Sequence, residues 1–166
     1  CSPLAVEAIK LELTQIGRYP DGNGFSLKQA IQQKFGFDLN RITLGNGSND
    51  ILELVARAFI AEGQSAVYSQ HAFAVYPLAV QAVGGVGIEV PAKNYGHDLP
   101  AMAQAITANT KVVFIANPNN PTGTWFSRVE FEQFMTQVPE HVIVVLDEAY
   151  VEFVTDSDFM NGFDYV

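Results

Sequence analysis

The chain has 166 residues, 48% of them hydrophobic and 16% charged, which fits one folded domain and excludes disordered and fibrous proteins. Nine Lys and Arg residues against 18 Asp and Glu residues give a net charge of -9, which disfavours binding to nucleic acid or to an anionic membrane surface. The single cysteine, Cys1, cannot form an internal disulfide bond.

The first third of the chain is expected to be largely helical. Apolar side chains recur at helical spacing in three segments, residues 4–16, 26–36 and 48–61. The turn-rich residues 18–24 separate the first two helices, and Ser26 is expected to cap the second one, because serine can accept a hydrogen bond from the first turn. A short strand is predicted over residues 42–44.

Strands and helices alternate in the rest of the chain. Strands are predicted over residues 66–69, 86–90, 111–116 and 142–147, with helices over residues 72–83, after Asp98 and over residues 127–138. Pro77 is expected to kink the first of these helices. The runs Val112–Ile115 and Val142–Leu146 are apolar at consecutive positions, as in strands buried on both faces. We therefore predict an α/β fold of three layers, in which helices cover both faces of a mostly parallel sheet.

Ligands of such open sheets bind beyond the carboxyl ends of the strands, where three segments of this chain attract attention. The first, residues 45–50, reads Gly-Asn-Gly-Ser-Asn-Asp before a helix. Its glycines let the backbone approach a ligand, and the free N–H groups of the helix start favour an anion such as phosphate. The alternative is a plain turn capped by Ser48. A dinucleotide fingerprint is excluded, because Asp50 stands where its third glycine is needed.

The second segment, residues 117–123, reads Asn-Pro-Asn-Asn-Pro-Thr-Gly and directly follows a buried strand. Its two prolines fix an irregular backbone, and an Asn-Pro bond is a candidate for the cis isomer. The unusual composition favours amide side chains that face a ligand. The alternative is a rigid loop whose asparagines satisfy only its own backbone.

The third segment, Asp147–Tyr150, ends the most apolar strand. A carboxylate against that core needs a cationic partner, either a protein group or a ligand, unless it only caps the next segment. An ATPase strand that binds magnesium would also end in Asp-Glu, but no Gly-Lys dipeptide is present for the P-loop that it requires. His71, His97 and His141 lack the spacing of metal ligands, so we predict no metal site.

These three segments, in this order, resemble the large domain of the pyridoxal-phosphate-dependent aminotransferases of fold type I. The specific feature is the Asn-Pro-Thr-Gly loop, followed by an apolar strand that ends in Asp-x-x-Tyr. Arg18-Tyr19-Pro20 and the residues 47–50 and 69–76 support the resemblance, which covers essentially the whole chain. Within the family, these features are similar to the members that act on histidinol phosphate.

The resemblance implies that the cofactor is pyridoxal 5'-phosphate and assigns residues to each of its polar groups. Asp147 would pair with the protonated pyridine nitrogen, so that the ring acts as an electron sink. Asn120 and Tyr150 would hydrogen-bond the phenolic oxygen. Ser48 and Asn49, with their backbone N–H groups, would hold the cofactor phosphate at the helix start.

Two aromatic residues complete the set that the resemblance implies. Phe73 would stack on the cofactor ring, where many relatives carry tyrosine. Tyr19 would reach the phosphate of the neighbouring subunit's cofactor, which implies a homodimer with shared sites. Alternatively, Phe73 and Tyr76 are core residues and Tyr19 is a turn aromatic that packs on Pro20.

A transaminase also needs a lysine that forms a Schiff base with the cofactor and moves a proton. In the family, this lysine lies in a Ser-Lys segment after the strand that follows Asp-x-x-Tyr. The lysines of this chain are Lys10, Lys28, Lys34, Lys93 and Lys111, and none matches that position. We therefore expect residues 1–166 to be one domain, a fragment of the cofactor-binding large domain without the N-terminal arm, the lysine segment and the small domain. We expect this fragment to be inactive alone.

For the parent protein, the resemblance implies a cytoplasmic homodimer that exchanges the amino group of histidinol phosphate with 2-oxoglutarate in histidine biosynthesis, releasing or using glutamate. Aminotransferases of aromatic amino acids and threonine-phosphate decarboxylases share these cofactor motifs and remain alternatives. A non-catalytic module that keeps the cofactor cradle for binding or dimerisation is an alternative of another class. A nucleotide-dependent oxidoreductase is disfavoured by Asp50.

Overall fold

A computed structural model describes the whole chain, residues 1–166, and divides it into two compact units, Cys1–Leu44 and Gly45–Val166. The single domain predicted for residues 1–166 stays a prediction, and the two units are described one by one. None of the helices combines the length and the apolar character that crossing a lipid bilayer requires.

The first unit is helical, and none of its residues is buried. It contains α1 (Pro3–Glu12), η1 (Leu13–Gln15), α2 (Phe25–Phe35) and η2 (Leu39–Arg41). The expected cap at Ser26 is wrong, because the Asp21 carboxylate accepts the N–H groups of Asn23 and Phe25 at 3.0 and 2.8 Å and α2 begins at Phe25. The strand expected at residues 42–44 is also wrong, since this unit contains no strand with which it could pair.

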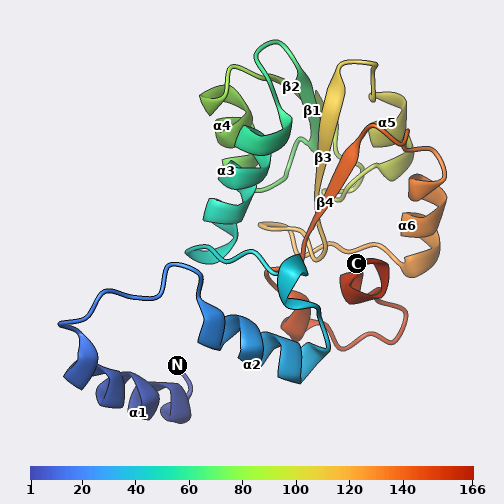
Figure 1. Cartoon of the computed structure of the whole chain (residues 1–166). Helices are drawn as coiled ribbons and strands as arrows, with labels where there is room; N and C mark the ends of the chain where they lie inside the picture. Colours follow the sequence, from blue (N-terminus) through green and yellow to red (C-terminus); the bar gives the residue numbers. More distant parts are fainter. The chain divides into compact units, whose positions relative to one another are not determined.

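The second unit confirms the predicted α/β fold (Figure 1). Its sheet consists of β1 (Ser65–Ser69), β2 (Val86–Val90), β3 (Thr110–Ala116) and β4 (Ile143–Asp147), all parallel, in the order β2-β1-β3-β4. Its helices are α3 (Gly47–Phe59), α4 (Val75–Ala82), α5 (Leu99–Gln104) and α6 (Arg128–Met135), followed by η3 (Val151–Phe153) and η4 (Gly162–Tyr165).

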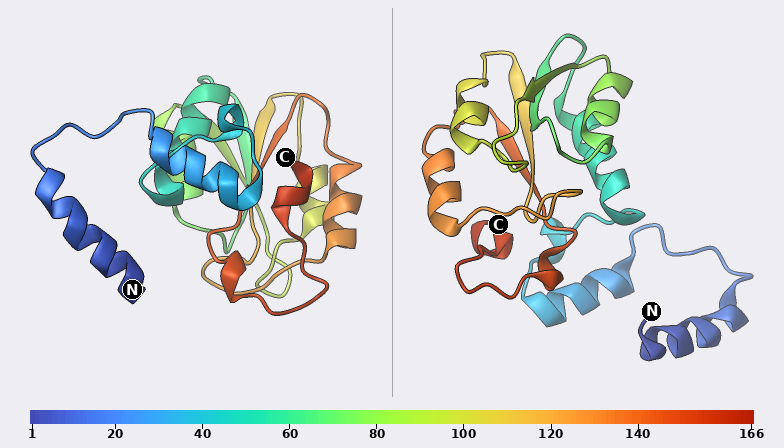
Figure 2. Two further views of the ribbon diagram at one scale, coloured as in Figure 1. Left: turned by 60° about the horizontal axis from the view of Figure 1, so that its bottom comes forward. Right: turned by 180° about the vertical axis from the view of Figure 1, so that it is seen from behind.

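Helices cover both faces of this sheet, and successive residues of a strand pack against helices on opposite faces. Val113 and Ile115 of β3 pack with residues of α5 and α6, whereas Val112 and Phe114 pack with residues of α3 and α4. The helix pairs stand on opposite sides of the strands in each view (Figure 2). The consecutive apolar residues of β3 are therefore all buried, as predicted, whereas the same prediction is wrong for Ile143 to Leu146, which are exposed or half-buried because β4 is an edge strand.

The sheet divides toward its carboxyl edge, between β1 and β3. These strands pair only as far as Val67 and Val113, whereas β3 continues beside β4 until Ala116 pairs with Asp147. The chain order also reverses here, because β1 leads outward to β2 and β3 leads outward to β4. Such a switch point opens a crevice beyond the strand ends, where ligands of α/β sheets bind.

The helix starts of the second unit follow from local side chains. Ser127 and Glu130 form a capping box at α6, and the Asp98 carboxylate accepts the N–H of Ala101 at 3.1 Å at the start of α5. Pro77 is the third residue of α4, where its missing N–H costs no helical hydrogen bond. The kink expected at Pro77 therefore has no cause.

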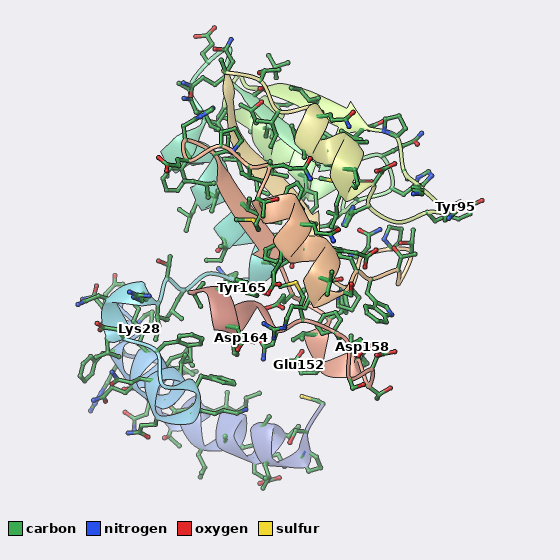
Figure 3. The ribbon with its side chains drawn as sticks, turned by 90° about the vertical axis from the view of Figure 1, so that its right-hand side faces the viewer. Lys28, Tyr95, Glu152, Asp158, Asp164 and Tyr165 are labelled. Atoms are coloured by element: carbon green, nitrogen blue, oxygen red, sulfur yellow. The ribbon has the colours of Figure 1, made fainter.

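The C-terminal segment is fastened to the rest of the second unit by side-chain hydrogen bonds. The Glu148 carboxylate, directly after β4, accepts the N–H of Gly162 at 2.8 Å. The C-terminal segment carries Asp164 and Tyr165, both labelled in Figure 3. The Tyr165 hydroxyl donates to Glu132 of α6 at 2.9 Å. Burial raises the pKa of Glu148, because desolvation disfavours its charged form.

Candidate functional site

A pocket of about 80 Å³ lies at the carboxyl edge of the sheet, bordered by the last residues of β3 and β4. Five of the seven predicted cofactor residues line it, namely Ser48, Phe73, Asn120, Asp147 and Tyr150. They come from the start of α3, the loop before α4, the loop after β3 and the end of β4. The structure thus brings together side chains that lie up to a hundred positions apart in the sequence.

Two predicted cofactor residues do not line this pocket. Asn49 follows Ser48 in the first turn of α3 and is exposed. Tyr19 belongs to the first unit, where its side chain is fully exposed. The roles assigned to both residues by the family resemblance stay predictions.

The start of α3 offers backbone donors beside the pocket. The helix has 13 residues, and Asn46 rather than Ser48 is its N-cap, without a side-chain hydrogen bond to the first turn. The Asp50 carboxylate turns back and accepts the backbone N–H of Asn46 at 2.9 Å and its side-chain amide at 3.2 Å. The first N–H groups of a helix have no partner within it, so those of Ser48 and Asn49 can receive an anion.

Asp147 is half-buried at the pocket and has no cationic partner in the chain. Its Oδ1 accepts the N–H of Ala149 at 3.2 Å, so it does cap the following segment. Its Oδ2 accepts a hydrogen bond from the Tyr76 hydroxyl at 3.1 Å. The three salt bridges of the structure all involve other carboxylates. The Asp147 side chain therefore has no protein cation beside it and is available to a cationic ligand.

Tyr76 is a site residue whose function sequence reasoning missed. It is fully buried and belongs to the core, with its ring stacked on Phe114 at 5.1 Å and edge-on to Phe73 at 6.0 Å. Its hydroxyl nevertheless reaches Asp147, and burial, with the charge and hydrogen bond of Asp147, raises the pKa of Tyr76. Phe73 lies in the loop before α4 and Tyr76 lies three positions later in the first turn of that helix, and this short spacing was the sequence signal that the two rings lie together.

The asparagines of the loop after β3 divide into structural residues and a pocket residue. Asn117 is fully buried, and its side chain donates to the carbonyl of Phe126 at 3.2 Å and accepts the N–H of Phe126 at 3.0 Å. The Asn119 amide donates to the carbonyl of His71 at 2.8 Å and to Thr122 at 2.7 Å. Asn120 faces the pocket. Asn117 and Asn119 thus hold the loop against neighbouring segments rather than only its own backbone, and the ligand contact expected of Asn120 stays a prediction.

The bonds Asn117-Pro118 and Asn120-Pro121 are both cis, which confirms the prediction of a cis Asn-Pro bond. Beyond this loop, a second hollow of about 660 Å³ shares Pro118, Asn120 and Tyr150 with the pocket. A ligand in the pocket would therefore have open space beside it for a second molecule.

The model of the family "Aminotransferase class I and II" matches residues 2–164. A histidinol-phosphate aminotransferase 2 from Pseudomonas fluorescens Pf-5 is 59% identical over 165 residues, which is 99% of this chain and 45% of that protein. The chain thus spans a little under half the length of the relative that it matches.

Solved structures agree with the sequence comparison. The histidinol-phosphate aminotransferase from Sinorhizobium meliloti, solved in complex with pyridoxal 5'-phosphate, superposes with a TM-score of 0.89 at 28% identity, over 95% of this chain and 43% of that chain. The L-threonine-O-3-phosphate decarboxylase from Porphyromonas gingivalis superposes with a TM-score of 0.80 at 25% identity, over 95% of this chain and 46% of that chain.

Proposed function

Because this chain belongs to the family of class I and II aminotransferases, we propose that it forms the cofactor-binding part of an enzyme that exchanges the amino group of histidinol phosphate with 2-oxoglutarate. One observation carries the proposal. The half-buried Asp147 carboxylate has no protein cation, and it shares a pocket with an aromatic ring and with amide and hydroxyl groups. That combination matches a cationic, aromatic, phosphorylated cofactor.

Pyridoxal 5'-phosphate fits the chemistry of these side chains. Asp147 would hold the protonated ring nitrogen, and Phe73 would stack on the ring. Asn120 and Tyr150 would donate hydrogen bonds to the phenolic oxygen. The N–H groups of Ser48 and Asn49 would bind the phosphate. When bound, the cofactor supplies an electron sink for the substrate carbon that loses its proton.

The sequence identities support histidinol phosphate as the substrate. The Pseudomonas relative named for that substrate is 59% identical to this chain, whereas the solved threonine-phosphate decarboxylase is 25% identical. We further propose that the enzyme is a cytoplasmic homodimer in which Tyr19 reaches the partner's cofactor, and that residues 1–166 belong to one large domain. The exposure of Tyr19 is compatible with contact to a partner.

The test uses the complete gene product that contains this sequence. Added pyridoxal 5'-phosphate should raise its Tm, because a ligand that binds only the folded state stabilises it by mass action. Histidinol phosphate with 2-oxoglutarate should then yield glutamate. Asp147→Ala should remove most of the Tm shift and the glutamate formation.

Asp158→Ala is the matched control, because it also removes an aspartate but from an exposed position outside the pocket. It should leave the Tm shift intact. A shift that survives Asp147→Ala would contradict the proposed pairing with the ring nitrogen. Cofactor binding without glutamate formation would favour the non-catalytic module.

A further inference from the structure

His97 lies at the point where the sheet divides, next to the last residue of β3. The N–H of Asn117 donates to the carbonyl of Asp147 at 2.9 Å, on the β4 side of the strand. Successive residues of a strand direct their backbone groups to opposite sides, so those of Ala116 face the side that β1 has left. There the Nε2 atom of His97 lies 3.0 Å from the carbonyl oxygen of Ala116 and 3.2 Å from its nitrogen.

From this arrangement we infer that His97 is a positioning residue, which replaces the missing strand partner of Ala116 and thereby holds Asn120 in place for the cofactor. This inference rests on the proposed function. Ala116 directly precedes the loop of residues 117–123, which contains Asn120. Ala116 and Asn120 line the same pocket as Asp147. A shift of the backbone at Ala116 would therefore be passed along four residues to the side chain that contacts the cofactor.

The surroundings of His97 fit a neutral imidazole ring that holds the backbone in place and has no role in proton transfer. Burial lowers the pKa of His97 to about 4, against a weaker opposite effect of the bond to Ala116. Its Nδ1 atom is buried without a hydrogen-bond partner, and its ring packs near Phe126 at 6.2 Å. Nε2 is thus the atom through which the ring contacts Ala116. It donates to the carbonyl oxygen of Ala116 in one tautomer and accepts the N–H of Ala116 in the other.

Other hydrogen bonds hold the loop itself, whereas His97 holds Ala116, the strand residue directly before the loop. Asn117 is paired with the backbone of Phe126, and Asn119 with the carbonyl of His71. Both of these contacts involve residues after Ala116. The contact from His97, which lies in the loop between β2 and α5, is made to the last residue of the strand itself.

The experiment measures the dissociation constant of pyridoxal 5'-phosphate in the complete gene product by equilibrium titration. His97→Leu removes the hydrogen bond that Nε2 makes to Ala116 in either tautomer and should raise this constant about tenfold, equivalent to about 1.4 kcal/mol. His97→Gln offers a donor and an acceptor to Ala116 and should stay within about threefold of the wild type. His141→Leu is the matched control, because His141 is exposed, and it should change nothing.

Two further readouts separate positioning from a general loss of stability. In a double-mutant cycle, His97→Leu should have little additional effect once Asn120→Ala has removed the side chain that it positions. Amide hydrogen exchange should accelerate at Ala116 in His97→Leu but not at Val113, in the middle of β3. If His97→Leu does not fold, His97→Asn replaces it, since its amide is too short to reach Ala116 and the same loss is expected.

The outcomes distinguish this inference from the proposed function. A wild-type protein that does not bind pyridoxal 5'-phosphate overturns the proposed function and the positioning role together. A wild type that binds, with a His97→Leu variant that binds equally well, overturns the positioning role alone. Losses of His97→Leu and Asn120→Ala that simply add in the cycle also overturn it, because His97 would then act independently of Asn120.

Discussion

The hydrogen bond from Tyr76 to Asp147 allows a sharp test of the pocket. Tyr76→Phe removes only the hydroxyl and keeps the ring contacts with Phe114 and Phe73. A hydrogen bond to a charged acceptor contributes about 1.5–3 kcal/mol, and the fully buried position of Tyr76 leaves no water to replace it. We expect the free energy of unfolding to fall by about 2 kcal/mol at neutral pH, and Tm by roughly 4–8 °C.

Urea unfolding, followed by the fluorescence of Trp125, measures this difference, since Trp125 is the single tryptophan of the chain. Tyr68→Phe is the matched control. Tyr68 is also buried, but its hydroxyl contacts no carboxylate through a hydrogen bond, so the change should stay within about 0.5 kcal/mol. In a protein that carries Asp147→Asn, the effect of Tyr76→Phe should shrink toward about 1 kcal/mol, because the acceptor is then neutral.

Equal effects of Tyr76→Phe and Tyr68→Phe at neutral pH would refute this reasoning. They would mean that the Tyr76 hydroxyl contributes nothing to the folded state and that Asp147 is not held by it. The same pair of variants also informs on the cofactor. If Tyr76 fixes the orientation of the Asp147 carboxylate, Tyr76→Phe should weaken the binding of pyridoxal 5'-phosphate while Tyr68→Phe should not.

Two other predictions follow from buried groups. Because of His97, the free energy of unfolding should decrease by at most about 3 kcal/mol as pH falls from about 6.5 to about 4. The histidine of the unfolded chain takes up a proton near pH 6.5, whereas burial lowers the pKa of His97 in the folded protein to about 4. Urea titrations across this range should show a flatter pH profile for His97→Gln, and an unchanged profile would contradict the burial of a neutral ring. Gly162→Ala should destabilise the protein by about 1 kcal/mol, because its Cβ would lie 2.6 Å from Oε2 of Glu148, and this carboxylate, which accepts the N–H of Gly162, would have to move. Gly22→Ala is the control, because its Cβ meets no neighbour, and it should change Tm little in the same thermal scan.

The sequence predicts the site better than it predicts the contacts that support the site. Asp147 and Asn120 follow apolar strands, and the carboxyl ends of parallel strands meet at one edge, so their proximity could be predicted without coordinates. Tyr76 and Asp147 are 71 positions apart, and no local pattern indicates their hydrogen bond. His97 is similarly paired with Ala116 across 19 positions, from a loop to the end of a strand.

The local errors have physical causes too. Ser26 has the right residue type for a cap, but Asp21 reaches the same helix start from a preceding turn and its charge makes the stronger acceptor. The three asparagines of the loop after β3 have the same chemistry, so composition alone cannot tell which of them faces the pocket. That depends on where Phe126 and His71 lie in space.

The order β2-β1-β3-β4 has a consequence for the newly made polypeptide. β4 pairs with β3 on one side, and its residues Ile143 to Leu146 are apolar, without a lysine, a proline or a bulge that would discourage a second neighbour. Its other side therefore remains a template for any extended segment that comes near while the chain leaves the ribosome. We therefore expect that pairing of copies of the chain through this side of β4 would favour aggregation during synthesis.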